Sequence, residues 1–175
     1  DSVSSHGLCE ALKRFGIPVQ VCSLINRIYS NRIFQVALNG ATSQFHKQEF
    51  GISQGCPLSP FLFSILMTII LYDCRSVLPD GCQIEDLLYA DDTLIMGKKT
   101  TDVQRYMDTI ANEGKRYGLL LNYDKLELLR INCDDNIYDP NGEAIQAKTS
   151  MRYLGALIIT TGDYNAEICA RLGMA

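Results

Sequence analysis

The sequence predicts an α+β fold, in which helices lie on one face of a mainly antiparallel sheet. Two observations predict it. Apolar residues recur at helical spacing in several segments, and shorter apolar or alternating segments lie between them, some beside two-residue turn signals. The chain has 175 residues, of which 47% are hydrophobic and 21% are charged, so it can bury a substantial core.

The first third of the chain predicts two helices and a hairpin. The apolar spacing of residues 8–15 predicts a helix that ends at Gly16, because glycine tolerates the backbone of a helix C-terminus. Residues 21–28 repeat the helical spacing and predict a second helix. Residues 34–38 alternate between apolar and polar and are followed by Asn39-Gly40, which predicts a β-hairpin.

A strongly apolar helix is expected over residues 61–72, with Ser59 as its N-cap and Pro60 in its first turn. A membrane span needs about 20 apolar residues, so we expect a buried helix and no membrane partner. Ser64 and Thr68 lie one turn apart and predict one polar stripe on this helix.

Residues 87–97 predict two apolar strands around a tight turn at Asp91-Asp92. A Thr-x-x-Gln pattern at Thr101 predicts a capping box, and the helix that follows is expected to end at Gly118.

The remaining part of the chain predicts shorter elements. Strands are expected over residues 119–122, 125–131 and 153–159, and Asn141-Gly142 predicts another hairpin. A last helix is expected from residue 163 onward.

The adjacent carboxylates Asp91 and Asp92 lie between apolar residues and need a physical reason. At about 5 Å, two carboxylates repel by about 1 kcal/mol in bulk water and several-fold more at a partly buried site. A divalent cation removes this repulsion, and Mg²⁺ accepts hard oxygen ligands together with water and phosphate. Paired metal ions support phosphoryl transfer. The alternative is a solvated acidic turn.

Three further features are candidates for binding or chemistry. Gly55 allows a ligand to approach the backbone closely, and Gln54 offers donors and acceptors to a base or sugar; the alternative is an ordinary loop before a helix. Lys125 is a candidate proton donor to departing pyrophosphate, or a solvated charge. The segment from Tyr153 to Gly155 could hold a nucleic-acid backbone or belong to the core.

Charge and cysteine usage narrow the class of protein. The net charge of −4 excludes a binder that works by bulk positive charge. The seven cysteines form no C-x-x-C pair and only two histidines are present, so no zinc spacing exists. We therefore expect free thiols in a reducing, intracellular compartment, nuclear or cytoplasmic. The sequence sets no oligomeric state.

Four motifs follow one another along the chain: Gln-Gly-Cys-Pro-Leu-Ser-Pro, Tyr-Ala-Asp-Asp, Gly-Leu-Leu-Leu-Asn-x-x-Lys and Tyr-Leu-Gly. With this order and spacing the chain resembles a reverse transcriptase of the non-LTR retrotransposon type. The resemblance implies a right-hand polymerase, with a ferredoxin-like palm over residues 56–150. It implies the end of the first palm motif and part of the fingers over residues 1–55, and the primer-grip strand and the start of the thumb over residues 151–175.

The resemblance also implies an activity and its partners. The activity is RNA-directed DNA polymerisation by two-metal phosphoryl transfer. Its cofactors are two Mg²⁺ ions, and its partners are an RNA template, a DNA primer and deoxynucleoside triphosphates. The implied roles fall on three groups of residues besides the metal ligands. They are Gln54, Gly55 and Tyr89 at the nucleotide and template pocket, Lys125 as proton donor, and Tyr153, Leu154 and Gly155 in the primer grip.

The metal ligands implied by the resemblance are Asp91, with Asp92 beside it, and one further Asp. Residues 1–3 resemble the end of the family segment that carries this Asp, so it is expected upstream, and the isolated chain is expected to be inactive. Ser53 replaces an arginine usual in the family, and Leu126 replaces a small hydroxyl residue.

Two alternatives stay open. One is a non-catalytic or decayed palm remnant that binds nucleic acid, which Ser53 and Leu126 favour slightly. The other is a different palm-type nucleotidyltransferase, either an RNA-templated RNA polymerase or a template-free nucleotide cyclase, because one fold hosts several activities.

Overall fold

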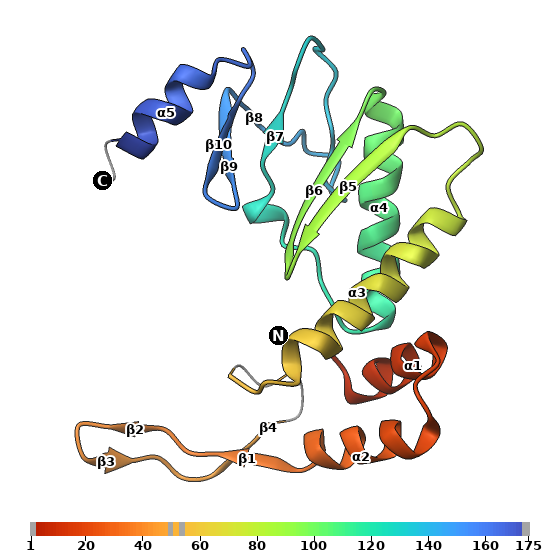
Figure 1. The fold of residues 1–175 in the computed structure, drawn as a ribbon, viewed down its shortest axis with the longest axis vertical. Helices are drawn as coiled ribbons and strands as arrows, with labels where there is room; N and C mark the ends of the chain where they lie inside the picture. Colours follow the sequence, from red (N-terminus) through yellow and green to blue (C-terminus); the bar gives the residue numbers. More distant parts are fainter. Residues whose placement is uncertain (1–2, 49–50, 53–54, 173–175) are drawn as a thin grey trace. The chain divides into compact units, whose positions relative to one another are not determined.

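The computed structural model describes residues 3–48, 51–52 and 55–172 (Figure 1). The chain divides into two compact units, Asp1–Pro79 with Asp108–Leu121 and Asp80–Met107 with Asn122–Ala175. Helices and mostly antiparallel strands occur in the chain, which confirms the predicted mixture of α and β structure. Within the described ranges each sheet has two strands, and the single larger sheet of the prediction is not formed there. Short turns pair sequence neighbours, whereas pairing between hairpins has no local signal.

The first unit is built on three helices. Helices α1 (Ser5–Phe15) and α2 (Val19–Tyr29) form where the sequence predicts them, and α1 packs against both α2 and α3 (Ser59–Ser76). Gly16, at φ 97°, ends α1 and donates its N–H to the carbonyls at the end of the helix. The core side chains of these helices include Leu8, Leu12, Cys22, Ile25, Leu62, Leu66 and Ile70.

Helix α3 begins at Ser59, so the prediction of Ser59 as its N-cap is wrong. The Ser59 hydroxyl is instead hydrogen-bonded to the Tyr29 hydroxyl at 3.1 Å, which explains why it does not cap the helix. The predicted polar stripe is confirmed, because Ser64 and Thr68 are exposed and the Thr68 hydroxyl donates to the Ser64 carbonyl at 2.8 Å. None of the helices in the described part of the chain is long and apolar enough to cross a membrane.

The predicted hairpin between α2 and α3 is confirmed and is longer than expected. Strand β1 (Arg32–Phe34) pairs with β4 (His46–Gln48), and β2 (Ala37–Leu38) pairs with β3 (Ala41–Thr42), all antiparallel. The turn residues Asn39-Gly40 have φ values of 51° and 81°, as a two-residue type I′ turn requires.

The second unit contains the predicted apolar hairpin, formed by β5 (Ile84–Tyr89) and β6 (Asp92–Gly97). The N-terminal part of α4 (Thr100–Arg116) packs against this hairpin. Gly97 leaves room for the helix, because a methyl group at this position would approach a side chain of α4 to 2.6 Å. The fully buried Tyr106 donates its hydroxyl to Asp86 of β5 at 3.2 Å.

The predicted capping box at Thr101 is wrong, because α4 begins at Thr100 and Thr101 lies inside the helix. The Gln104 side chain is used elsewhere. Its Nε2 donates to the Tyr138 carbonyl at 3.0 Å, and its Oε1 accepts the Tyr138 N–H at 2.7 Å. The predicted end of α4 is confirmed, since Gly118 with φ 84° follows the helix.

The two strands predicted over residues 119–131 are largely absent. A 3₁₀ turn, η1 (Tyr123–Lys125), precedes β7 (Leu128–Leu129), which pairs in parallel with β8 (Ala147–Lys148). The polar run around η1 favours a turn over a strand. The predicted hairpin at Asn141-Gly142 is confirmed only as a turn. Hydrogen bonds to Asp139 close this turn, and a single antiparallel bridge joins Tyr138 to Ala144.

The strand predicted over residues 153–159 is wrong, because this segment turns. Strands β9 (Ser150–Tyr153) and β10 (Ala156–Ile159) pair around Leu154-Gly155, whose φ values are 51° and 82°. Helix α5 (Tyr164–Leu172) packs on β10, where the Leu157 N–H donates to Glu167 at 2.7 Å.

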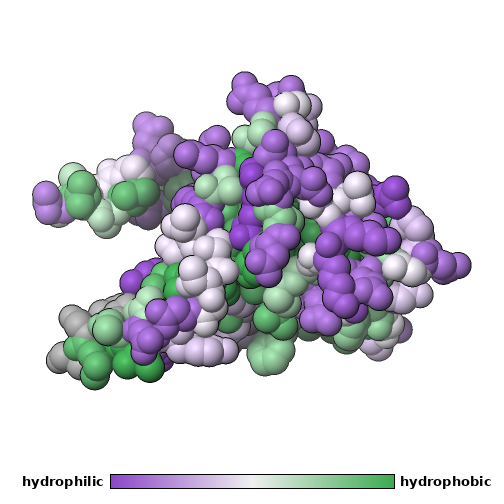
Figure 2. All heavy atoms as spheres, turned by 90° about the horizontal axis from the view of Figure 1, so that it is seen from above, coloured by the Kyte–Doolittle hydropathy of each residue, from purple (hydrophilic) through white to green (hydrophobic). Residues whose placement is uncertain are grey.

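Large hydrophobic side chains also reach the surface in both units. Leu38, Leu120 and Leu172 are each more than 70% exposed, at 71%, 71% and 72%. On the face drawn in Figure 2, hydrophobic residues in green interrupt a mostly hydrophilic surface.

Candidate active site

The acidic turn lies at the tip of the β5–β6 hairpin. Its two loop residues are Ala90 and Asp91, because Tyr89 pairs with Asp92 as the last rung of the ladder. The turn is therefore shifted by one residue from the predicted Asp91-Asp92, and Asp92 begins β6. Both carboxylates and Tyr89 are exposed. The tip thus presents two neighbouring carboxylates to solvent.

Ala90 adopts the positive φ of this turn, at 52°. This conformation is costly for an L-residue with a Cβ and is typical of glycine. Backbone strain of this kind concentrates at functional sites.

We expect Ala90→Gly to stabilise the protein by about 1 kcal/mol, because glycine adopts this φ without a Cβ clash. The measurement is the midpoint of denaturant unfolding at an unchanged slope. Ala37→Gly, at a position in strand β2, is the matched control and should destabilise the protein. Equal shifts for the two variants would argue against strain at Ala90.

The hairpin with the Tyr-Leu-Gly motif contacts the strand that leads to the acidic turn. The Tyr153 hydroxyl donates to the Leu87 carbonyl of β5 at 2.9 Å. The structure therefore joins the hairpin of the predicted primer-grip residues to the strand that leads to the predicted metal ligands. No local sequence pattern indicates this contact, because it joins a side chain to the backbone of a residue 66 positions away.

We expect Tyr153→Phe to remove this hydrogen bond at a cost of about 0.5–1 kcal/mol, the lower part of the range for a typical intramolecular hydrogen bond, because Leu87 is exposed. Amide hydrogen exchange should become faster in β5 and β9 than in the rest of the chain. Tyr164→Phe, at a side chain that is 82% exposed, is the control and should leave exchange unchanged. Unchanged protection in β5 would contradict the prediction.

The other predicted residues are distributed as follows. Gly55 has a φ of 81° and is exposed, in agreement with the expected backbone freedom. Gln54 and Ser53 lie outside the described residues. Lys125 is exposed and lies in the η1 turn, not in the predicted strand. Among the described residues, no hydrogen bond or ion pair joins Lys125 to Asp91.

The thiol of Cys56 follows Gly55 in the same motif. The Tyr29 hydroxyl donates to its sulfur at 3.5 Å and lowers the pKa of Cys56, with a further contribution from the Leu58 N–H. The loop before α3 is therefore tied to α2 through Tyr29.

The donor set at the tip fits a hard divalent cation only in part. Residues 76–97 carry five carboxylates and no Lys or Arg, so this part of the chain attracts cations. Asp91 and Asp92 supply the oxygen ligands that Mg²⁺ accepts. Within the described ranges, no group of three or more His, Cys, Asp or Glu is arranged to hold a metal ion. The two carboxylates could hold a cation with further ligands from water or phosphate.

The comparison with known families identifies the class of protein to which the chain belongs. The chain belongs to the reverse transcriptase (RNA-dependent DNA polymerase) family, whose model matches residues 1–158. This confirms the predicted resemblance. It also favours the reverse transcriptase reading over an RNA polymerase or a nucleotide cyclase.

The curated relatives are retrotransposon proteins, which confirms the non-LTR type. A Pol polyprotein from the type-1 retrotransposable element R2 of Popillia japonica is 31% identical over 132 residues, covering 71% of this chain and 18% of the relative. The RNA-directed DNA polymerase from the mobile element jockey of Drosophila melanogaster is 24% identical over 166 residues, covering 89% of this chain and 18% of the relative. The chain therefore spans about a fifth of the length of these relatives.

Proposed function

We propose that this chain is part of an RNA-directed DNA polymerase that extends a DNA primer on an RNA template with deoxynucleoside triphosphates. The observation that carries the proposal is the exposed Asp91 and Asp92 tip, whose strand is bonded to the Tyr153 hairpin. Family membership supports it. In this proposal residues 56–150 serve as palm, residues 1–55 as part of the fingers and residues 151–175 as primer grip and start of the thumb.

The proposed chemistry at the tip depends on cations. Two Mg²⁺ ions, when bound, would activate the primer 3′-hydroxyl and stabilise the leaving oxygen of the α-phosphate. Asp91 is the proposed direct ligand and Asp92 its support. Because residues 76–97 carry only negative charge, the tip would repel a polyanionic primer unless cations neutralised it. We therefore expect the binding of a primer at this tip to depend on a metal ion.

The remaining roles are proposed for residues around the tip and the motif loop. The Lys125 ammonium would give a proton to the departing pyrophosphate, and its exposure leaves it accessible to a substrate. The Tyr153–Gly155 turn would hold the primer end near Asp91. Gln54, Gly55 and Tyr89 would border the incoming nucleotide and the template base.

Two carboxylates alone do not complete a two-metal site, so we propose that a third comes from a longer polypeptide, as the family resemblance implies. The 175-residue chain alone should then extend primers little or not at all. The proposed reducing, intracellular environment rests on the sequence, whose seven cysteines form no C-x-x-C pair.

The test is primer extension by a longer polypeptide that includes the flanking coding sequence. With an RNA template, a labelled DNA primer and Mg²⁺, deoxynucleotides should be added in preference to ribonucleotides, and a chelator should abolish addition. Absence of extension under these conditions would favour a decayed remnant, and extension without template would favour another palm enzyme. Primer extension by the isolated 175-residue chain would contradict the proposal that its metal site is incomplete.

A further inference from the structure

The loop that leads from the β1–β4 hairpin into α3 is fixed where it begins. We call it the motif loop, and the structure describes it at residues 51–52 and 55–58. Gly51 accepts a hydrogen bond from the Arg32 guanidinium at 2.7 Å and donates its own N–H to the Val3 carbonyl at 2.9 Å. The next residue, Ile52, is only 6% exposed and belongs to the core. Two hydrogen bonds and one buried side chain therefore hold the start of the loop.

The end of the motif loop is held by Tyr29, the last residue of α2. The Tyr29 hydroxyl donates to the Cys56 sulfur at 3.5 Å and is hydrogen-bonded to the Ser59 hydroxyl at 3.1 Å. Because a phenol has one proton to give, Ser59 is the donor in the second bond. Tyr29 is 5% exposed, so the packing of α2 against the core fixes the place of its ring. The hydroxyl therefore joins the end of the loop and the start of α3 to a rigid element.

Tyr29 and Arg32 also contact each other. The Arg32 Cζ lies 4.5 Å from the centroid of the Tyr29 ring, within the distance at which a cation is attracted to an aromatic face. We call these two residues the loop clamp. One contacting pair of side chains thus holds the start of the motif loop through a guanidinium and its end through a hydroxyl.

Gly55 lies between these two ends and stays open. It is exposed, with a φ of 81°, and among the described residues no atom other than those of its chain neighbours lies within 4 Å of the place of a Cβ. Backbone of this kind loses conformational entropy when it binds a ligand, unless its flanks are held beforehand. The loop clamp supplies this preorganisation.

We propose that Tyr29 and Arg32 are positioning residues, which hold the backbone around Gly55 ready for the incoming nucleotide. The inference rests on the proposed function, in which Gly55 borders the nucleotide. Neither side chain touches the reacting atoms, and each acts through the backbone of the motif loop. Loss of either contact lowers the fraction of molecules that are competent to bind, and the apparent affinity for nucleotide falls by the same factor. The rate at saturating nucleotide is unchanged.

The first test is amide hydrogen exchange in the 175-residue chain, without metal or nucleotide. Tyr29→Phe keeps the ring for the core and for Arg32 but removes the hydroxyl. It should speed exchange of the Ser59 amide about tenfold relative to the amide of the buried Leu66 in α3. Arg32→Met removes the donor to the Gly51 carbonyl and should speed exchange of the Gly51 amide by a similar factor.

Matched controls separate the loop clamp from general effects on folding and charge. Tyr117→Phe also removes a hydrogen-bonded hydroxyl from a fully buried tyrosine, and Arg27→Met also removes a guanidinium, at an exposed position of α2. Both should leave the exchange of Gly51 and Ser59 unchanged relative to Leu66.

The second test is steady-state primer extension by the longer polypeptide on an RNA template. Tyr29→Phe and Arg32→Met should each raise the KM for the deoxynucleotide about tenfold and leave kcat within about twofold. A merely structural role would reduce the amount of active protein, which lowers kcat at an unchanged KM. Arg32→Lys should recover most of the KM, because an ammonium can still donate to the Gly51 carbonyl, and Arg27→Met should leave the KM unchanged.

The two tests fail separately. Unchanged exchange at both Gly51 and Ser59 would overturn the loop clamp, whether or not the longer polypeptide extends primers. Faster exchange with an unchanged KM would overturn its role in nucleotide binding. A longer polypeptide that extends no primer would contradict the proposed function and with it the nucleotide role, and the exchange rates would still decide whether the clamp exists.

Discussion

Asp91→Asn in the longer polypeptide is expected to lower the rate of nucleotide addition by about a thousandfold or more. The amide keeps the size of the side chain but loses the negative charge that we propose holds a divalent cation at the tip of β5–β6. Stabilisation of transition-state charge by a metal ion is worth several kcal/mol, and each 1.36 kcal/mol corresponds to a factor of about ten in rate. Single-turnover primer extension at saturating Mg²⁺ measures the loss.

The matched control for this prediction is Asp80→Asn, which makes the same change at an exposed carboxylate before β5. It should leave the rate unchanged. Asp92→Asn should give a smaller loss than Asp91→Asn, because Asp92 is paired in the strand as a supporting group. A rate for Asp91→Asn within a few-fold of the control would remove Asp91 from the proposed metal site.

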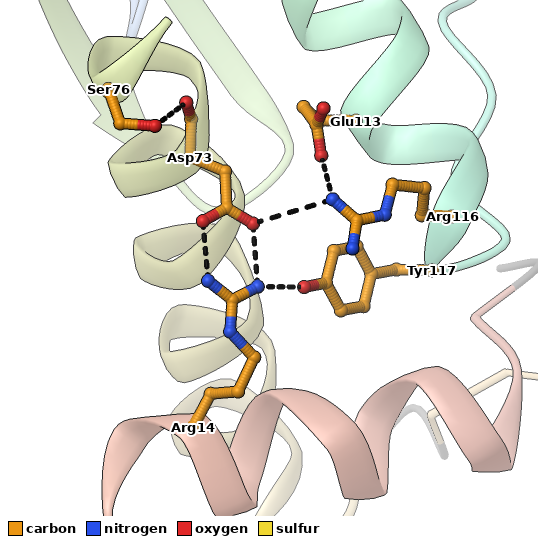
Figure 3. Close-up of polar contacts among 6 residues, drawn as sticks. All are labelled: Arg14, Asp73, Ser76, Glu113, Arg116 and Tyr117. Atoms are coloured by element: carbon orange, nitrogen blue, oxygen red, sulfur yellow. Dashed lines mark hydrogen bonds and ion pairs between the residues drawn. The ribbon is translucent and has the colours of Figure 1, made fainter.

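Asp73→Asn is expected to destabilise the protein by about 2 kcal/mol. Two hydrogen bonds join the Arg14 guanidinium to the Asp73 carboxylate at 2.5 and 2.6 Å, and Figure 3 shows them linking α1 to α3. Arg14 also donates to the hydroxyl of the buried Tyr117 at 2.6 Å, and Arg116 lies 4.0 Å from Asp73. Charge-assisted hydrogen bonds of this kind contribute about 1.5–3 kcal/mol. Chemical denaturation measures the change.

The pH dependence of stability provides a second measurement of the same cluster. The hydrogen bonds from Arg14 lower the pKa of Asp73 from its ordinary value of 3.8. A lowered pKa in the folded state gives stability that is present above the ordinary value and lost as the pH falls through the lowered one. The difference in stability between the unaltered chain and Asp73→Asn should therefore be full at pH 6 and shrink below about pH 4.

Two controls define this prediction. Asp80→Asn should change stability little, because exposed charges contribute little. Tyr117→Phe should cost about 1 kcal/mol by removing a single hydrogen bond to Arg14. A difference between Asp73→Asn and the unaltered chain that is constant from pH 6 to pH 3 would mean that the carboxylate charge is not the source of the stabilisation.

Elements with strong local signals could be predicted from the sequence. Helix α1 combines apolar spacing with Gly16 as its end, and the β2–β3 turn combines alternation with Asn39-Gly40. The acidic hairpin was also predicted, within one residue of its turn. In each case residues within a few positions of one another determine the structure.

Elements that depend on distant partners were predicted poorly. Ser59 has the residue type of an N-cap, but its hydroxyl contacts Tyr29. Gln104 matches a capping box, but its amide binds the backbone of Tyr138. Leu154 shows no turn preference and nevertheless adopts a positive φ. A short pattern gives the residue type, whereas the competing tertiary contact decides how the side chain is used.

The same principle applies to the candidate site. The motifs gave Asp91 and Tyr153 as separate candidates, and the hydrogen bond from Tyr153 to Leu87 is what relates them in the structure. Nothing in the spacing of two residues 62 positions apart indicates which backbone carbonyl a hydroxyl will reach. Predictions for Gln54 fall on a residue outside the described ranges and stay predictions.

The Asn39-Gly40 turn makes the hairpin prone to deamidation. Asparagine is a thermolabile residue, and a following glycine leaves its side-chain carbonyl open to attack by the next backbone nitrogen. Ammonia leaves, and water opens the resulting ring to aspartate or isoaspartate. Either product introduces a carboxylate into residues 19–48, which otherwise have none. Isoaspartate also lengthens the main chain within a two-residue turn, so old samples should lose both the pairing of β2 with β3 and the local positive potential.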